Sequence, residues 1–214
     1  MRKLREAGLI LCGVLFFLTL SVTVTLAFRP LYYLDIDLLK IEEDTGFSGQ
    51  EIRENYDTLI DYNLYPWEKK LTFPTFPMSE EAEIHFAEVK VIFQRFLFLL
   101  PVTGLLFLIG GGICIRRGEY RFLKGTAVCS ILVPLILAAL IAVNWEWVFV
   151  TFHELVFQND YWLFDPSTDP VILILPDAFF MHCALMILLL LAACSFVCLR
   201  VYHRRQMIVK KEAV

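Results

Sequence analysis

The sequence has 214 residues, of which 58% are hydrophobic and 14% aromatic, and its formal net charge at pH 7 is −4. Soluble domains contain about 45–50% apolar residues, so this composition argues against a soluble protein and indicates that the lipid bilayer is the solvent. The small net charge hides an uneven distribution and gives no support to nucleic-acid binding, so no nucleic-acid partner is expected. The composition predicts an integral membrane protein.

Four stretches are long and apolar enough to cross a hydrocarbon core of ~30 Å as helices, at ~1.5 Å per residue. They are residues 8–27, 91–115, 125–143 and 178–199. The basic start MRKLRE precedes the first stretch, but the apolar run that follows is longer than the roughly 7–15 residues typical of a signal peptide. We therefore interpret the first stretch as an uncleaved membrane anchor.

Basic residues gather in three places, at residues 2–5, in the loop 116–124 and in the tail 200–214. Short segments rich in Lys and Arg remain on the cytoplasmic side of a membrane, so both termini and this loop are predicted to be cytoplasmic. The segments 28–90 and 144–177 hold 20 of the 23 acidic residues and are predicted to be extracellular. Neither contains a cysteine, so no disulfide framework is expected to hold them.

The segment 28–90 is predicted to form most of a small extracellular cap of mixed structure. Alternation of side chains from Tyr33 to Ile41 favours a strand, whereas apolar residues at helical spacing in 48–64, with Ser48 as N-cap, favour a short helix. The prolines that follow favour an extended path. Ser79 is then predicted to cap a helix that runs into the second span, with acidic residues in its first turn.

The predicted fold class is thus an all-α polytopic membrane protein with four transmembrane helices and this cap. The expected order is the N-terminal tail and first span (1–27), cap and start of the second helix (28–90), second span (91–115), cytoplasmic loop (116–124), third span (125–143), second extracellular segment (144–177), fourth span (178–199) and basic cytoplasmic tail (200–214).

The histidines are the main candidates for chemistry. His85 precedes the second span and His153 follows the third, so both are predicted at the outer interface, beside carboxylates. An imidazole with an ordinary pKa of ~6.5 can act as base or acid at neutral pH. His182 is expected to be a packing residue at the start of the fourth span, and His203 to be solvated in the tail. We therefore interpret His85 and His153 as the functional pair.

Motifs for other chemistries are incomplete. The string HELVF lacks the second histidine of HExxH, and no other cluster has the spacing of metal ligands. There is no GxSxG elbow, no Walker loop and no cysteine in the outer segments to act as nucleophile. The glycines of IGGGICI (109–115) lie within a span, where close helix packing is their expected role. Two histidines without a nucleophile suit a reaction whose nucleophile belongs to the substrate, with no metal and no cofactor.

The string TFHELVFQNDYWLFDPSTDPVILILPDAFF (151–180), the lone histidine of EEAEIHFAEVK and the four-span layout resemble the lipoprotein intramolecular transacylases, Lit, of Gram-positive bacteria. The resemblance implies a cell-membrane acyltransferase whose partners are membrane lipids and a diacylglyceryl lipoprotein. It implies transfer of the sn-2 acyl chain to the amino group of the lipoprotein's own N-terminal cysteine, giving a lyso-form lipoprotein, with His85 and His153 as the catalytic pair. Pro170, after Asp169, departs from the pattern expected for the family.

Further residues are expected to bind the substrate. Trp145, Trp147 and Trp162 bracket His153, where they either keep water from the ester or form an interfacial aromatic belt. Asn159 and Asp160 are acceptors for an imidazole or for the substrate ammonium, and are equally good turn formers. Three aromatic residues of the cap are candidates for a roof over the site: Trp67, Phe73 and Phe76.

Two other classes of function stay open at the level of sequence. A non-enzymatic membrane scaffold or transporter subunit explains the spans and the acidic cap, although transporters place ionisable residues near the bilayer midplane, where this sequence has none. A metal-dependent membrane hydrolase explains histidines near carboxylates, and loss of activity with a chelator distinguishes it.

Overall fold

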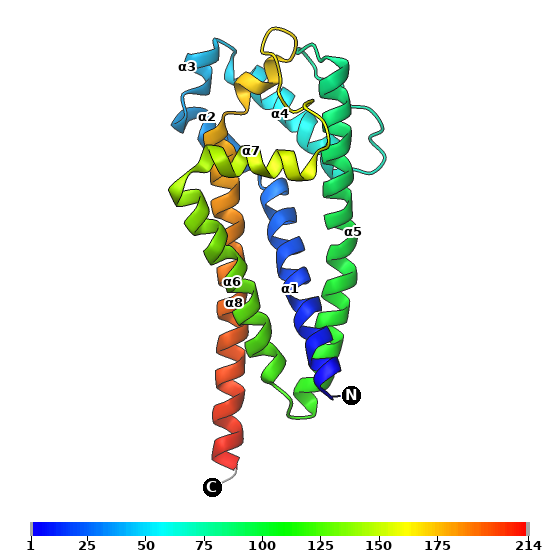
Figure 1. Cartoon of the computed structure of the whole chain (residues 1–214), viewed down its shortest axis with the longest axis vertical. Helices are drawn as coiled ribbons and strands as arrows, with labels where there is room; N and C mark the ends of the chain where they lie inside the picture. Colours follow the sequence, from blue (N-terminus) through cyan, green and yellow to red (C-terminus); the bar gives the residue numbers. More distant parts are fainter. Residues whose placement is uncertain (1, 213–214) are drawn as a thin grey trace. The chain divides into compact units, whose positions relative to one another are not determined.

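The computed structural model describes residues 2–212, and within this range all regular structure is helical (Figure 1). In chain order the elements are α1 (Arg2–Ala27), α2 (Arg29–Leu38), α3 (Ile41–Thr45), α4 (Gly49–Leu64), α5 (Glu80–Arg116), α6 (Arg121–Val143), α7 (Trp145–Val156), the 3-10 helix η1 (Pro170–Ile174) and α8 (Asp177–Glu212). The first residue of the predicted N-terminal tail and the last two of the predicted basic tail lie outside the described residues.

Among the described residues, four helices have the length and composition to cross a membrane. They are α1, α5, α6 and α8, and each contains one of the stretches predicted from hydropathy. Pro101 and Pro134 lie inside α5 and α6. A lipid-exposed backbone must satisfy its own polar groups, which is why these apolar stretches are helical. The prediction of an all-helical membrane protein with four spans is confirmed.

The strand predicted from Tyr33 to Ile41 is wrong. These residues form the end of α2, a turn at 39–40 and the first residue of α3, and no strand occurs anywhere in 2–212. Pro30 lies in the first turn of α2, where its fixed φ suits a helix and its missing N–H costs nothing. The buried residues Tyr32 and Ile36 are four apart, so they share one helix face, and this spacing outweighed the local alternation.

The helices predicted to begin after Ser48 and Ser79 are both confirmed. The Ser48 hydroxyl accepts a hydrogen bond from the backbone N–H of Glu51, at 3.3 Å, at the start of α4. The Ser79 hydroxyl accepts one from the N–H of Ala82, at 3.1 Å, at the start of α5. Each cap satisfies one of the free donors of a first helical turn. The second fixes where α5 begins, five residues before His85.

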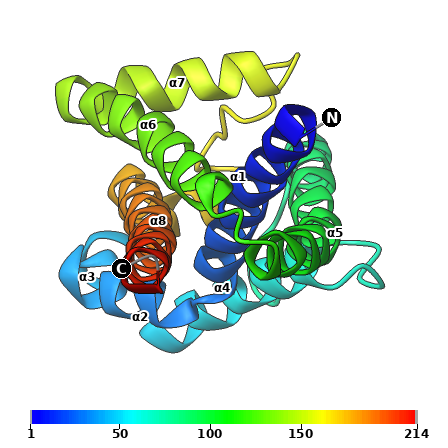
Figure 2. The same ribbon diagram turned by 90° about the horizontal axis from the view of Figure 1, so that it is seen from below.

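The pattern of contacts between residues that lie close in space divides the chain into two compact units. Unit 1 comprises residues 1–22, 96–139 and 186–214, which supply long stretches of α1, α5, α6 and α8; Figure 2 shows these helices from below. Small residues allow close packing within it. A methyl group added to Gly13 would lie 2.5 Å from the ring of Phe107, and one on Gly110 would lie 2.6 Å from Leu9. The latter supports the packing role expected for the glycines of 109–115.

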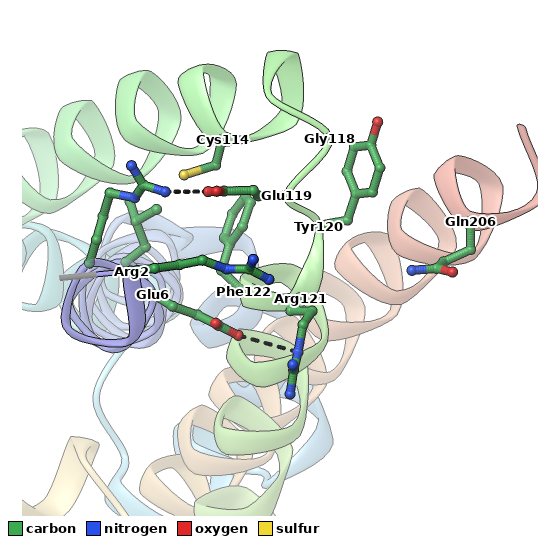
Figure 3. A pocket seen from close by; sticks show the side chains of 11 residues that line it. Arg2, Glu6, Cys114, Gly118, Glu119, Tyr120, Arg121, Phe122 and Gln206 are labelled. Atoms are coloured by element: carbon green, nitrogen blue, oxygen red, sulfur yellow. Dashed lines mark hydrogen bonds and ion pairs between the residues drawn. The ribbon is translucent and has the colours of Figure 1, made fainter. Parts of the chain in front are cut away.

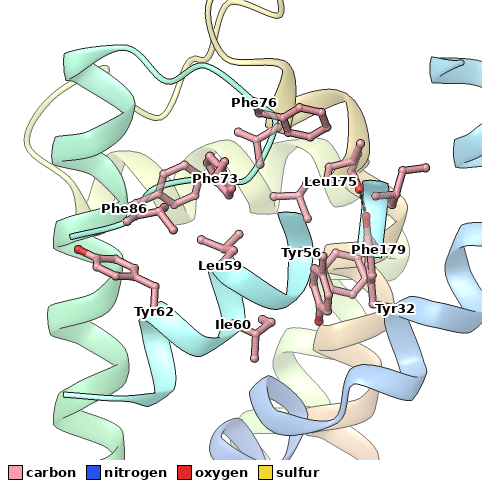
Figure 4. Close-up of a cluster of buried hydrophobic side chains, with 14 of the residues drawn as sticks. Tyr32, Tyr56, Leu59, Ile60, Tyr62, Phe73, Phe76, Phe86, Leu175 and Phe179 are labelled. Carbon is pink, nitrogen blue, oxygen red and sulfur yellow. Dashed lines mark hydrogen bonds between the residues drawn. The ribbon is translucent and has the colours of Figure 1, made fainter. Parts of the chain in front are cut away.

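Unit 2 comprises residues 23–95 and 140–185 and has its own hydrophobic core (Figure 4). Tyr32 of α2 stacks on Tyr56 of α4, with ring centroids 3.7 Å apart, and the edge of Phe179 of α8 meets both rings. The Tyr32 hydroxyl donates to the backbone carbonyl of Ile174 in η1, at 2.7 Å. Segments more than 140 residues apart in sequence are therefore joined in one core.

The start of α5 is tied to the end of α4. The Lys90 ammonium donates to the carbonyl groups of Tyr62, Tyr65 and Glu68. Gln94 donates to the carbonyl of Asn63, at 2.7 Å. The carbonyls of Tyr62 and Asn63 belong to the last turn of α4, which lacks partners in the helix itself, and those of Tyr65 and Glu68 belong to the segment that follows. The segment of α5 that carries His85 is thereby held against the rest of unit 2.

Candidate active site

His85 lies in the second turn of α5, before the membrane-spanning stretch 91–115, and only 6% of its surface is exposed. His153 lies in the last turn of α7, a helix that begins after Asn144, whose side chain accepts from the N–H of Trp147 at 2.9 Å. The helix α7 was not predicted, because the segment 144–177 was interpreted only as an extracellular connection. The helix places His153 in unit 2, where it is half-buried.

The two histidine rings lie side by side. Their centroids are 6.1 Å apart and the ring planes make an angle of 30°. The fold thus brings two imidazoles together from residues 68 positions apart in the sequence. The structure brings together the pair that the sequence singled out.

A hydrogen bond fixes the tautomer of His153. Its Nδ1 lies 2.8 Å from the backbone carbonyl oxygen of Phe149, one turn earlier in α7. Because a carbonyl oxygen only accepts, Nδ1 carries the proton, and Nε2 of the neutral ring keeps a free lone pair. His85 differs, because its Nδ1 is buried and has no hydrogen-bond partner among the described residues. His153 is thus arranged as a base, while His85 has a ring nitrogen left for a ligand.

Both rings are neutral at pH 7. Burial, and to a lesser extent the neighbouring His153, lower the pKa of His85 to about 4. Burial also lowers the pKa of His153, although its bond to the Phe149 carbonyl and the charge of Asp177 act in the opposite direction. Desolvation disfavours the charged form of an imidazole, and two imidazoles this close disfavour each other's charge. Two neutral imidazoles thus provide one hydrogen-bond acceptor and one hydrogen-bond donor. Neither ring places a permanent charge in the apolar site.

Aromatic rings enclose the pair. Around His85 the nearest ring centroids are those of Phe157 at 4.6 Å and Phe164 at 5.4 Å. Around His153 they are those of Phe149 at 4.2 Å and Trp162 at 4.8 Å. The three phenylalanines were not among the predicted site residues, although Phe149 and Phe157 lie one helical turn before and after His153. An apolar wall of this kind keeps water away and strengthens polar interactions inside it.

Comparison with known proteins decides the family. Residues 7–180 match the model of the family described as "Lipoprotein intramolecular transacylase Lit". The chain belongs to the Lit family. It is therefore a lipoprotein intramolecular transacylase by family, an enzyme of the membrane, and the alternative of a non-enzymatic scaffold or transporter subunit is set aside. Among curated protein sequences none matches the chain.

Solved structures agree. The in meso structure of the lipoprotein intramolecular transacylase Lit from Bacillus cereus is 34% identical, covers 99% of this chain and 98% of its own, and superposes with a TM-score of 0.94. Structures of the same enzyme with its H85R and H85A mutations are also 34% identical and cover 99% of this chain. They cover 93% and 96% of their own chains, each with a TM-score of 0.86.

In this Lit-family chain, the predicted binding residue Asn159 has a structural contact. Its side-chain amide donates to both carboxylate oxygens of Glu88, at 3.1 and 3.2 Å, and its oxygen accepts from the N–H of Tyr161. Glu88 lies one turn after His85 on α5 and was missed by the sequence analysis. Asp160 is exposed, and its carbonyl closes a turn by accepting from the N–H of Leu163, at 3.0 Å. Asn159 thus fixes the loop after α7 against α5, and Asp160 closes a turn within the loop.

The aromatic residues proposed from sequence lie in different surroundings. Trp162 contacts His153, and Trp145 packs against Phe149 with ring centroids 5.9 Å apart. Trp147, in contrast, is 55% exposed. Of the three proposed for a roof, Phe73 and Phe76 are buried in the core of unit 2, and Trp67 is exposed and stacked on Tyr65. The rings that enclose the histidines come instead from α7 and the loop after it.

The other two histidines lie elsewhere. His182, at the start of α8, is bound through Nδ1 to the carboxylate of Asp35 in α2, at 2.8 and 3.0 Å. Asp35 is 1% exposed, so the pair is a buried contact that joins two elements of unit 2. His203 is exposed on α8. Within residues 2–212 no group of three or more His, Cys, Asp and Glu side chains is arranged to hold a metal ion.

A hollow of about 230 Å³ lies in unit 1, among charged side chains of α1 and of the connection between α5 and α6 (Figure 3). Its charges are largely paired with each other. Arg5 pairs with Glu119, and Arg121 lies 3.8 Å from Glu6. These exposed pairs join α1 to the connection, and each is worth at most about 1 kcal/mol. The hollow contains none of the histidines.

Proposed function

We propose that the enzyme moves the sn-2 acyl chain of a diacylglyceryl lipoprotein to the amino group of the same lipoprotein's N-terminal cysteine. The observation that carries this proposal is the pair of neutral histidines, 6.1 Å apart and enclosed by aromatic rings. An ester-to-amide transfer needs one group to take a proton from the attacking amine and one to serve the departing glyceryl oxygen. The substrate supplies its own nucleophile, so the enzyme needs none.

In the proposed mechanism His153 is the base. The neutral amine attacks the ester carbonyl, a nitrogen–carbon bond forms, and His153 takes the amine proton at Nε2, the nitrogen left free by the bond to Phe149. The carbon–oxygen bond to the glyceryl group then breaks. His85, kept neutral by burial, donates a hydrogen bond to the departing oxygen, which finally receives the proton held by His153. One proton moves from nitrogen to oxygen, and both histidines return to their starting state.

The rate is proposed to come from proximity and from proton transfer together. Donor and acceptor are part of one molecule, and well-oriented intramolecular reactions reach effective molarities of ~10⁵–10⁸ M. A correctly placed acid or base adds roughly 10²–10⁴-fold. The relative from Bacillus cereus has been solved with its H85R and H85A mutations, which supports a role for a histidine in this family. No metal or cofactor takes part in the proposed reaction.

The proposal is tested by mass spectrometry of lipoprotein N-terminal peptides from cells with and without this gene. With the enzyme, we expect an acyl group on the cysteine nitrogen and a single acyl chain on the glyceryl group. Without it, the same peptides are expected to keep both glyceryl acyl chains and a free amine. Identical peptides in the two strains contradict the proposal, as does loss of the acyl group without its gain on nitrogen, since that outcome indicates a hydrolase.

We further propose that the histidine pair faces the outside of the cell. In this arrangement both termini and the loop 116–124 are cytoplasmic, and the segments 28–90 and 144–177 form an extracellular cap. The support is the excess of Lys and Arg in the proposed cytoplasmic parts and of Asp and Glu in the others.

Reporter fusions test the orientation. Fusions at Glu119 and after Val214 are expected to report a cytoplasmic position, and a fusion at Ser48 an extracellular one. The expected contrast is all-or-none, because a loop cannot cross the bilayer without moving its basic residues through it. An external signal from Glu119 contradicts the proposed orientation and the boundaries derived from it.

A further inference from the structure

The indole N–H of Trp162 is a buried donor without a partner. Its nitrogen is inaccessible to solvent and makes no hydrogen bond to any described residue. Buried indole N–H groups normally find an acceptor, because leaving a buried polar group without a hydrogen bond is destabilising. An unsatisfied buried donor in a native protein needs an explanation. One recognised explanation is that the group forms its hydrogen bond with a ligand.

This donor lies at the histidine pair. The Trp162 ring is 4.8 Å from the ring of His153, at an angle of 30°. The Trp162 ring, which carries this donor, is therefore part of the wall around His153. The other buried indole nitrogen without a partner belongs to Trp145, whose ring packs on Phe149 rather than on a histidine.

The loop that carries Trp162 is held in place. Asn159 anchors it to Glu88 of α5, and within the loop Tyr161 and Leu163 donate backbone hydrogen bonds to Asn159 and Asp160. A donor fixed before the reaction needs no reorganisation when charge develops, and this preorganisation is the main source of oxyanion stabilisation in enzymes. The position of Trp162 is therefore set by the same contact that joins the loop to the helix of His85.

The other donors at the pair are already engaged in the proposed mechanism. Nδ1 of His153 donates to the Phe149 carbonyl, Nε2 acts as the base, and His85 serves the glyceryl oxygen. The carbonyl oxygen of the ester becomes negatively charged when the amine attacks and still needs a donor. An indole N–H donates only and does not ionise at neutral pH, so it stabilises an oxyanion without exchanging a proton with it.

We propose that the Nε1–H of Trp162 donates the hydrogen bond that stabilises the oxyanion formed from the sn-2 ester carbonyl. This inference rests on the proposed function and adds a third group to its mechanism. The bonds formed and broken and the movement of the single proton stay as described above, because Trp162 transfers no atom. The geometry thus assigns His153 to proton transfer, His85 to the departing oxygen and the tryptophan to the negative charge.

The test uses the purified full-length enzyme in detergent with a synthetic diacylglyceryl-cysteinyl peptide that has a free amino terminus. One variant carries benzothienylalanine at position 162, which keeps the shape of tryptophan and replaces the N–H by sulfur. A second is Trp162→Phe. Trp67→Phe is the control, because Trp67 is exposed and its ring stacks on Tyr65. Thermal unfolding of each variant shows whether the fold is kept.

We expect both variants at position 162 to lose roughly 10²–10³-fold in kcat, as when one oxyanion donor is removed, with a KM that changes far less. The control is expected to keep the wild-type kcat. Wild-type kcat in the benzothienylalanine enzyme overturns the inference. So does a lower kcat with a matching rise in free fatty acid, because that result assigns Trp162 to the exclusion of water.

The same assay separates this inference from the proposed function. If His85→Ala and His153→Ala abolish transfer while the benzothienylalanine enzyme is fully active, only the oxyanion assignment fails. If both histidine variants keep full activity, the proposed mechanism fails, whatever the result at position 162.

Discussion

Replacing His153 by alanine is expected to lower the rate of acyl transfer by roughly 10²–10⁴-fold, the usual contribution of a placed acid or base. The hydrogen bond from Nδ1 to the Phe149 carbonyl leaves Nε2 as the acceptor for the amine proton, and no other described histidine lies beside it except His85. His85→Ala is expected to cause a similar loss, because the departing oxygen loses its donor. The double variant is expected to be little worse than either, since both residues serve one proton path.

These losses are measured as kcat on the purified variants with the diacylglyceryl-cysteinyl peptide, after their amounts in the membrane have been compared. His203→Ala is the matched control, because His203 is exposed on α8 and lies in the other unit. Near-normal activity in either single variant removes that histidine from the mechanism. A strictly multiplicative loss in the double variant contradicts a shared proton path.

The second large effect is expected on stability. His182→Ala leaves the Asp35 carboxyl group, which is 1% exposed, without its hydrogen-bond partner, and leaving a buried polar group unpaired costs about 1–3 kcal/mol. The pair joins α2 to α8 beside the stacked rings of Tyr32 and Tyr56, so the core of unit 2 is expected to loosen. The activity of each molecule that remains folded is expected to be close to wild type.

Thermal unfolding in detergent measures this effect. The informative comparison is the double variant Asp35→Leu with His182→Leu, which removes both polar partners and leaves no uncompensated carboxylate. It is expected to unfold at a higher temperature than His182→Ala, because replacing both members of a buried pair by apolar residues is often neutral. A wild-type unfolding temperature for His182→Ala shows that the contact contributes nothing, and a stable but inactive variant assigns His182 to the chemistry.

The membrane architecture was predictable because its cause is local. A stretch such as 125–143 has no charged residue, and in lipid its backbone can satisfy its polar groups only as a helix. The caps at Ser48 and Ser79 were predictable for a similar reason, since a hydroxyl at that position bonds within three residues.

The rest of unit 2 depends on contacts that the sequence does not display. The segment 33–41 alternates locally, yet Tyr32 is held by Tyr56, Phe179 and the carbonyl of Ile174, all distant in sequence, and these contacts favour the helix. Tertiary packing commonly overrides local preference for short segments. For the same reason η1, the 3-10 helix whose Ile174 carbonyl accepts this bond, was not predicted.

The candidate site was predictable in its chemistry and not in its surroundings. His85 and His153 were identified because histidine is rare here and both flank predicted spans. Glu88 was missed because its partner Asn159 lies 71 residues away, and Phe164 because one more phenylalanine among 19 carries no signal. Trp162 was predicted as a binding residue because of its aromatic ring. That its indole nitrogen is buried without a partner follows only from the folded structure of the loop.

The central claim is that transfer stays within one lipoprotein and passes through no acylated enzyme. It is tested with purified enzyme in detergent, a chelator, no added phospholipid, and two lipoproteins of different peptide sequence, one with isotopically heavy acyl chains and the other with light ones. Mass spectrometry is expected to find every N-acylated peptide with its own isotope, undiminished yield in the chelator, and little free fatty acid. Labels scrambled between the two peptides, or transfer that stops when the chelator is added, contradict the account.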